Sequence, residues 1–333
     1  MKILDNLKKN TILLLCITLL VLYILLKDDF EEIINAFQHI NFLYIGLAII
    51  FFFLSVIIKG YVNYIIANDK EKLSLKEAIK HNFITQFFNG VTPFSTGGQP
   101  MEIYMLREHG IPLTKATNQT IQSFIFYQIA LVICGIIAVS YNFFFHVFPK
   151  VKLLQHFVFL GFLINVAVAV ILLLISSSHA MTKRIERIVK WICKKFKINI
   201  NEQELSEKIE DFHKGFQELK RRKGLLFRGV SLNIISLLLL YTTPLLVLYS
   251  MSGNYSMKFV ETITASAYVY IVGSFVPIPG ASGGIEYSFT QFFGNFIGLD
   301  MISAVLIIWR TITYYLGIII GALLFNLEKK VKK

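Results

Sequence analysis

Long uncharged apolar runs constrain this chain more than any other feature. The stretches Thr11–Leu26, Phe42–Ile58 and Phe157–Ile175 each hold 16 or more residues without a charged side chain. That length approaches the ~20 apolar residues with which a helix crosses a bilayer. Charged residues make up 16% of the chain, whereas soluble domains contain about 25%. The sequence therefore predicts an all-α, polytopic integral membrane protein.

The apolar pattern divides the chain, read as one transmembrane domain over 1–333, into full spans and interrupted segments. Proline and glycine interrupt two apolar segments, 78–107 and 259–297, because proline lacks an amide donor and glycine disfavours a helix. We expect each to form a re-entrant hairpin of two half-helices. Six full spans are expected near 11–26, 41–58, 117–140, 156–176, 225–250 and 301–325.

Basic residues indicate the orientation of the spans, because cytoplasmic loops carry an excess of Lys and Arg. With a cytoplasmic N-terminus and both hairpins returning to their side of entry, 28 of the 33 basic residues fall on the cytoplasmic side. We therefore expect a multi-pass protein of the cell membrane with both termini in the cytoplasm. The segments expected outside are 27–40, 141–155 and 251–258.

The two breaks share a sequence pattern. Residues 93–98 and 279–284 both read Pro-x-x-Ser/Thr-Gly-Gly, 186 positions apart, and a glutamate follows each, Glu102 or Glu286. In the expected topology the first hairpin enters from the cytoplasm and the second from outside. Inverted repeats whose broken helices meet near mid-bilayer are a common plan for transporters. The sequence predicts that the two breaks face one another.

The segment 177–224 is the one expected extramembrane module. It reads as two amphipathic helices, about 181–197 and 202–222, in which Ile, Trp and Phe are interleaved with Lys and Arg. Such helices lie on anionic lipid, so the expected partner is the inner-leaflet surface. Nucleic acid is not an expected partner, because the basic charge lies where membrane topology requires it.

Motifs of known catalysts are absent from the sequence. It contains no His-Glu-x-x-His, no P-loop and no Gly-x-Ser-x-Gly. We expect no catalytic residue, no metal site and no cofactor. This pattern favours a protein that is not an enzyme, and it leaves an enzyme open.

The candidate substrate site lies at the two breaks. Arg310 is placed inside the last span, where a charge costs ~2.5–3.5 kcal/mol or more, and Glu286 is its expected partner. Either the pair stabilises the fold, or Arg310 binds an anionic headgroup that Glu286 releases. The half-helix N-termini near Met101 and Ile285 are expected to offer free N–H groups to an anion. The candidate binding residues are Arg310, Glu286, Gly280, Gly283, Gly284 and Ser282 at the second break, and Glu102, Gly97, Gly98, Thr96 and Arg107 at the first.

These residues resemble a known family. The stretch 275–287, Phe-Val-Pro-Ile-Pro-Gly-Ala-Ser-Gly-Gly-Ile-Glu-Tyr, and the later 307–315 are similar to the flippase-like transmembrane region of lysylphosphatidylglycerol synthases. The first break, 92–102, with Tyr104, Leu106 and Arg107 after it, is similar to the first Pro-x-x-x-Gly-Glu/Asp segment of that family. The residues that match its second break and following span are Pro277, Pro279, Gly280, Gly284, Glu286 and Arg310.

Two departures from the family pattern limit what the resemblance implies. The family often carries an arginine in the span after the first break, but 117–128 has only glutamine and asparagine among its large polar residues. The chain also ends at Lys333, without room for the soluble aminoacyl-transfer domain. The resemblance thus implies a flippase-like unit that does not itself make lysylphosphatidylglycerol.

The expected function is transfer of an anionic or zwitterionic phospholipid, or another polar-headgroup lipid, between leaflets. The alternative is an intramembrane enzyme or accessory subunit that acts on lipid-linked substrates. The sequence leaves the oligomeric state open, a homo-oligomer included.

Overall fold

The computed structural model describes residues 40–67, 73–148, 152–177, 179–195, 201–251 and 257–331, apart from the single residues 275, 295 and 298. Within these ranges the chain is helical and contains no strand, as expected. The expected first span, 11–26, and nearly all of the expected external segment 27–40 lie outside the described residues.

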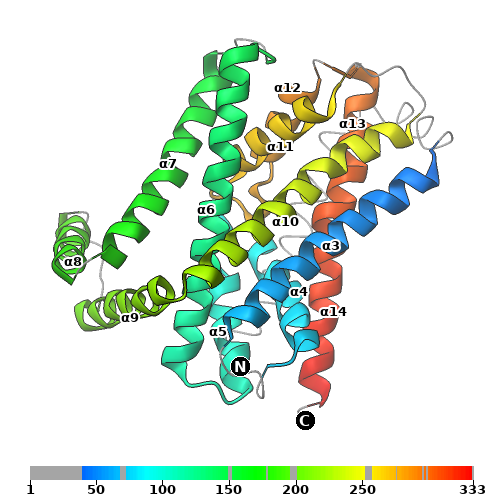
Figure 1. Cartoon of the computed structure of the whole chain (residues 1–333). Helices are drawn as coiled ribbons and strands as arrows, with labels where there is room; N and C mark the ends of the chain where they lie inside the picture. The colour runs from blue at the N-terminus through cyan, green and yellow to red at the C-terminus, as the bar shows by residue number, and fades with distance from the viewer. Residues whose placement is uncertain are drawn as a thin grey trace.

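The helices follow the predicted order of spans and breaks (Figure 1). Their bounds are α3 Phe42–Ile66, α4 Leu75–Gly90, η1 Pro93–Ser95, α5 Gly98–Glu108, α6 Leu113–Phe145, α7 Lys152–Ser177, α8 His179–Lys195, α9 Glu202–Arg221, α10 Lys223–Ser250, α11 Phe259–Gly273, η2 Pro279–Ala281, α12 Gly284–Phe293, α13 Leu299–Arg310, η3 Thr311–Tyr315 and α14 Leu316–Val331. η1 and η2 are short 3₁₀ turns, and η3 is a π-helical turn inside a longer continuous helix.

Among the described residues, four helical stretches are long and apolar enough to cross a membrane. They confirm the expected spans 41–58, 117–140, 225–250 and 301–325 as Phe42–Ile66, Leu113–Phe145, Lys223–Ser250 and Met301–Leu327. Helix α7 covers the expected span 156–176, and the apolar part identified in it, His156–Ile171, is shorter. The protein is thus a multi-pass membrane protein, and the part that the structure describes is all-helical.

Small residues bring the helices into close contact. Helices α3 and α10 cross side by side (Figure 1), and at their contact the Ser236 hydroxyl donates to the Ser55 carbonyl oxygen at 3.0 Å. Helix α14 packs on α4 through Gly317 and Gly321, where a side chain would collide with Gln86 or with the α4 backbone. Small residues four apart permit such close packing between membrane helices.

Both interrupted segments fold as helical hairpins, as the sequence predicts. Helix α4 packs against α5, and α11 packs against α12. The α4–α5 hairpin lies at the lower end of the bundle in Figure 1 and the α11–α12 hairpin at the upper end. Between the two hairpins, the turns η1 and η2 contact one another. The prediction that the two breaks meet is confirmed.

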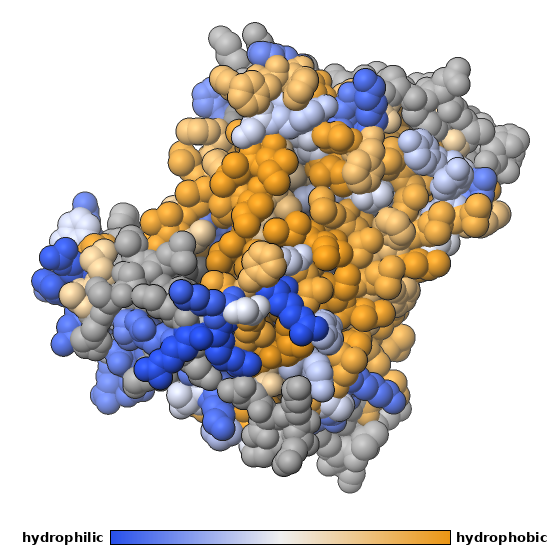
Figure 2. All heavy atoms as spheres, in the orientation of Figure 1, coloured by the Kyte–Doolittle hydropathy of each residue, from blue (hydrophilic) through white to orange (hydrophobic). Residues whose placement is uncertain are grey.

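The surface separates into an apolar band and hydrophilic ends. Figure 2 shows apolar residues across the middle of one face and hydrophilic residues gathered over α8 and α9. These two helices confirm the helices expected at 181–197 and 202–222. Lys190 links them, lying 2.8 Å from Glu186 and 3.4 Å from Glu202. Hydrogen bonds from Lys190 and Ser206 hold the pKa of the Glu186 carboxyl below its usual range.

Candidate functional site

The second break is a tight turn that proline starts and a hydroxyl closes. Ile278 is extended, Pro279 begins the turn, and the amide and hydroxyl of Ser282 both donate to the Pro279 carbonyl oxygen, at 3.4 and 3.1 Å. Gly280 and Gly283 have φ values of 65° and 84°, a region that glycine adopts without steric cost. The Pro-x-x-Ser-Gly-Gly pattern therefore follows the end of α11 at Gly273 and starts α12 in a new direction.

The first break begins with the same turn. Thr96 donates to the Pro93 carbonyl oxygen through its amide and hydroxyl, at 3.3 and 3.0 Å, as Ser282 does to Pro279. Phe94 and Ser95 both have φ 52°, and the equivalent Gly280 and Ala281 have 65° and 53°. The backbones then diverge, since Gly97 has φ −77° and the equivalent Gly283 has φ 84°. Non-glycine residues at positive φ are strained, and such strain is typical of functional segments.

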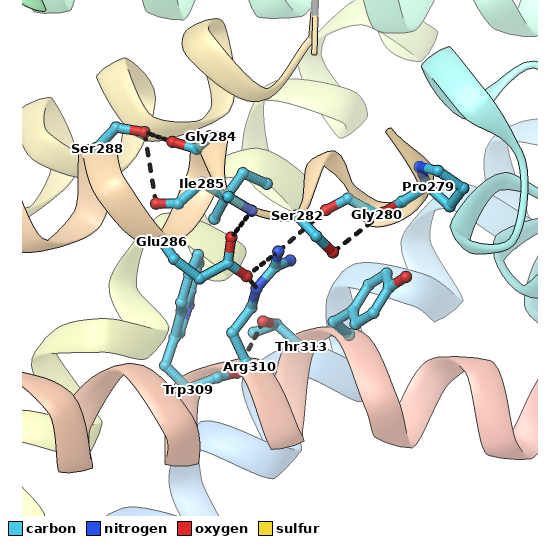
Figure 3. Close-up of polar contacts among 12 residues, drawn as sticks. Pro279, Gly280, Ser282, Gly284, Ile285, Glu286, Ser288, Trp309, Arg310 and Thr313 are labelled. Carbon is cyan, nitrogen blue, oxygen red and sulfur yellow. Dashed lines mark hydrogen bonds and ion pairs between the residues drawn. The ribbon is translucent and has the colours of Figure 1, made fainter. Parts of the chain in front are cut away.

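Arg310 and Glu286 form the buried ion pair that the sequence predicts. The Arg310 Nε donates to Glu286 Oε1 at 2.8 Å, and Nη2 donates to the Gly280 carbonyl oxygen at 3.0 Å (Figure 3). The two side chains are 4% and 6% exposed. Glu286 also accepts the Gly283 amide at 2.6 Å, so one carboxylate joins the span to the start of α12. The pair holds Arg310 against the second break.

A tyrosine in the π-helical turn connects the two breaks. The Tyr314 hydroxyl donates to the Gly90 carbonyl oxygen at 2.9 Å, at the end of α4, and its ring lies 4.8 Å from the Arg310 guanidinium. A side chain at Gly280 would collide with the same Tyr314 hydroxyl. Single π-helical turns in long helices occur frequently at functional sites. Tyr314 therefore packs between both hairpins, beside the ion pair.

A cavity of about 490 Å³ lies where the hairpins and spans meet. Of the predicted site residues, Arg310, Gly280 and Glu102 line it, and Glu286 reaches it through Arg310. The other predicted residues, Thr96, Gly97, Gly98, Ser282, Gly283 and Gly284, shape the turns without lining it, and Arg107 is exposed at the end of α5. Much of the lining is polar, namely Ser55, Lys59, Asn63, Asn82, Thr85, Gln86, Asn89, Ser95, Gln99, Glu102, Thr120, Ser123, Gln128, Asn165, Asn233, Ser274, Arg310 and Thr313.

Glu102 is buried at the cavity wall beside α3. The Asn63 side-chain amide donates to Glu102 Oε1 at 2.8 Å, and Asn63 Oδ1 accepts the Ser123 hydroxyl at 2.5 Å. On the opposite wall, Asn165 joins α7 to the second break, since its Nδ2 donates to the Ser274 hydroxyl at 2.7 Å. These networks satisfy polar groups that would each cost several kcal/mol if left unpaired in hydrocarbon.

The half-helix N-termini are less open to an anion than the sequence suggests. Helix α5 begins at Gly98, three residues before the expected Met101, and its first amides are occupied. The Gly97 amide donates to the Thr92 hydroxyl and the Gly98 amide to Asn89 Oδ1, each at 2.8 Å. Pro100 has no N–H to offer. The expectation of free N–H groups is wrong for most of this terminus, because side chains of the preceding segment cap it.

Sequence reasoning missed Lys59, Asn63 and Asn165. The expected span 41–58 leaves Lys59 just outside the membrane on the cytoplasmic side, but α3 continues to Ile66, so this lysine lies inside a spanning helix and lines the cavity. A signal was present in the sequence: Ser55, Lys59 and Asn63 are spaced by four and therefore share one helix face. A polar stripe along an apolar helix indicates a buried polar surface.

No metal centre emerges in the described ranges: nowhere in them do three His, Cys, Asp or Glu side chains gather closely enough to hold an ion.

Comparison with known proteins gives one family. The model for the lysylphosphatidylglycerol synthase TM region matches residues 11–321. A UPF0104 membrane protein of Methanocaldococcus jannaschii is 25% identical over 340 residues, covering 97% of this chain and 96% of the relative. Another of Archaeoglobus fulgidus is 24% identical over 273 residues, 77% of each chain. An uncharacterized protein of Mycoplasma genitalium is 24% identical over 328 residues, 90% of this chain and 81% of the relative.

Proposed function

Because the chain belongs to the lysylphosphatidylglycerol synthase transmembrane-region family, we propose that it transfers a phospholipid or other polar-headgroup lipid between the two leaflets of the cell membrane. The observation that carries this proposal is the cavity of about 490 Å³ between the hairpins and the apolar spanning helices, with Lys59, Glu102 and Arg310 and many uncharged polar side chains in its lining. A lipid headgroup that enters hydrocarbon loses its hydrogen bonds to water, and this loss is costly unless other polar groups replace them. A cavity lined with amides, hydroxyls and charges supplies the hydrogen bonds that the headgroup loses.

Arg310 is the proposed contact for the headgroup phosphate. Its hydrogen bonds to Glu286 and Gly280 use Nε and Nη2, and the side chain lines the cavity. A guanidinium donates from a rigid planar fork, which suits the oxygens of a phosphate. Glu286 neutralises the Arg310 guanidinium when no substrate is bound, so the arginine can lie at this depth.

The two hairpins provide the proposed route to both leaflets. They lie at opposite ends of the bundle (Figure 1), and their breaks begin with the same turn and contact one another. We propose that they are inverted repeats related by a two-fold axis in the membrane plane. In this orientation the termini and α8–α9 lie in the cytoplasm, and the amphipathic pair rests on the anionic inner leaflet. Rocking of one hairpin against the other opens the cavity to each side in turn.

A leaflet-exchange assay tests this proposal. Purified protein is reconstituted into liposomes that contain acyl-labelled phospholipids, and an impermeant reductant bleaches the label of the outer leaflet. The proposal predicts that bleaching continues beyond the outer-leaflet fraction in protein-containing vesicles and stops there in protein-free ones. Mass spectrometry of the same lipids checks the alternative. Chemically altered lipid with no exchange would favour an intramembrane enzyme, and neither outcome in vesicles that hold folded protein would exclude both.

A further inference from the structure

We infer that Lys59 and Glu102 form a second charged subsite in the cavity, which binds a zwitterionic headgroup with its phosphate on Lys59 and its ammonium on Glu102. This inference rests on the proposed function and names the class of lipid. It differs from a site built on Arg310 alone, because the charge of Arg310 is already matched by Glu286 at 2.8 Å. Arg310 therefore donates hydrogen bonds to the headgroup phosphate without adding net charge, and Lys59 supplies the positive charge that the same phosphate requires.

Lys59 is a cation without a counter-charge. It lies on α3, lines the cavity, and places its Nζ 4.8 Å from the centre of the Tyr127 ring. Among the described residues it has no carboxylate within ion-pair distance. An aromatic face stabilises an ammonium only in part. A lysine within a membrane helix that faces a polar cavity marks a substrate or ion pathway by default, and its natural ligand is an anion.

Glu102 is the corresponding carboxylate without a cation. It is 6% exposed, lines the same cavity, and accepts one side-chain hydrogen bond, from Asn63 at 2.8 Å. No Lys or Arg among the described residues lies within ion-pair distance of it. Asn63 is itself fixed by Ser123 and Gln119, so the carboxylate is held in place rather than mobile. A buried, oriented carboxylate that lines a cavity is suited to an ammonium group.

Lys59 and Glu102 lie in one lining and are linked through Asn63. Lys59 and Asn63 are one turn apart on the same face of α3, about 6 Å along the helix axis, and the Asn63 side chain donates to Glu102. A headgroup whose phosphate and ammonium are joined by a short bridge, as in phosphoethanolamine, is the class proposed to bind both residues. A zwitterion neutralises both charges at once. A purely anionic headgroup satisfies Lys59 and is repelled by Glu102.

The test compares headgroups in the leaflet-exchange assay. Wild-type protein should move acyl-labelled phosphatidylethanolamine faster than phosphatidylglycerol. Glu102→Gln should slow phosphatidylethanolamine about tenfold, which corresponds to about 1.4 kcal/mol, and leave phosphatidylglycerol unchanged or faster. Lys59→Gln should slow both lipids. The matched controls are Glu108→Gln and Lys115→Gln, which remove the same charges from exposed positions and should change neither rate.

The outcomes separate the two proposals. If wild-type protein moves no lipid, the proposed function fails. If it moves lipids without regard to headgroup charge, or if Glu102→Gln slows both lipids equally, the zwitterion site is refuted and the proposed function stands.

A second measurement uses wild-type protein alone, so it does not depend on the folding of a variant. Short-chain phosphatidylethanolamine should raise the melting temperature of detergent-solubilised wild-type protein more than short-chain phosphatidylglycerol at equal concentration. Equal shifts would overturn the inference. Soluble phosphoethanolamine serves as the chain-free arm, and a shift with this compound but none with the lipid would refute a lipid as the ligand.

Discussion

The contact between Gly280 and Tyr314 can be tested by two matched substitutions. Gly280→Ala and Gly110→Ala each place a methyl group at a left-handed position of positive φ, where an L-residue costs roughly 1–2 kcal/mol. At Gly110, after the end of α5, the new Cβ meets open space, whereas at Gly280 it meets the Tyr314 hydroxyl and ring. Overpacking of a well-packed site costs typically about 1–3 kcal/mol. The free energy of unfolding should therefore fall by about 1–3 kcal/mol more for Gly280→Ala than for Gly110→Ala.

The assay is unfolding of the purified variants in detergent, followed by tryptophan fluorescence. Tyr314→Ala removes the colliding ring, so Gly280→Ala in that background should cost no more than Gly110→Ala does in the wild type. The contact reasoning is refuted if the two glycine variants are equally destabilised, or if the excess cost of Gly280→Ala persists without the tyrosine ring.

Three further predictions concern the ion pair, the first break and the orientation. Arg310→Ala strands Glu286 and should cost about 3–5 kcal/mol in unfolding free energy, and the double variant with Glu286→Gln should recover part of that loss. Asn89→Ala removes the cap on the first amide of α5 and should lower the free energy of unfolding by about 1 kcal/mol, measured in the same assay. In a cysteine-free background, an impermeant maleimide added to intact cells should label Phe144→Cys and not Lys183→Cys, and the reverse pattern would contradict the proposed orientation.

The sequence was sufficient to predict the breaks and the buried ion pair, for physical reasons. Proline and glycine act locally, so the interruptions near 93–98 and 279–284 did not depend on knowledge of the packing. Arg310 could be paired because an isolated charge inside a span is costly and Glu286 was the nearest carboxylate by topology. In both cases a local or strongly energetic rule was enough.

What the sequence could not supply depends on the relative placement of helices. The Tyr314 contact with Gly90 joins residues 224 positions apart and requires the π-helical turn, which no sequence pattern announced. Lys59 was misassigned because a charge near the end of an apolar run is ordinarily an interfacial anchor. The capping of α5 by Asn89 and Thr92 arises from the return of the chain on itself, which only the folded hairpin brings about.

A lipid headgroup that crosses the membrane through the cavity should be blocked by a bulky side chain placed there. Thr85→Trp fills the cavity from α4, and its control, Ile137→Trp, adds the same side chain to an exposed apolar position of α6. Both proteins should be folded by gel filtration. In the leaflet-exchange assay Thr85→Trp should abolish exchange while Ile137→Trp retains the wild-type rate, and a wild-type rate for folded Thr85→Trp would show that the headgroup does not pass through the cavity.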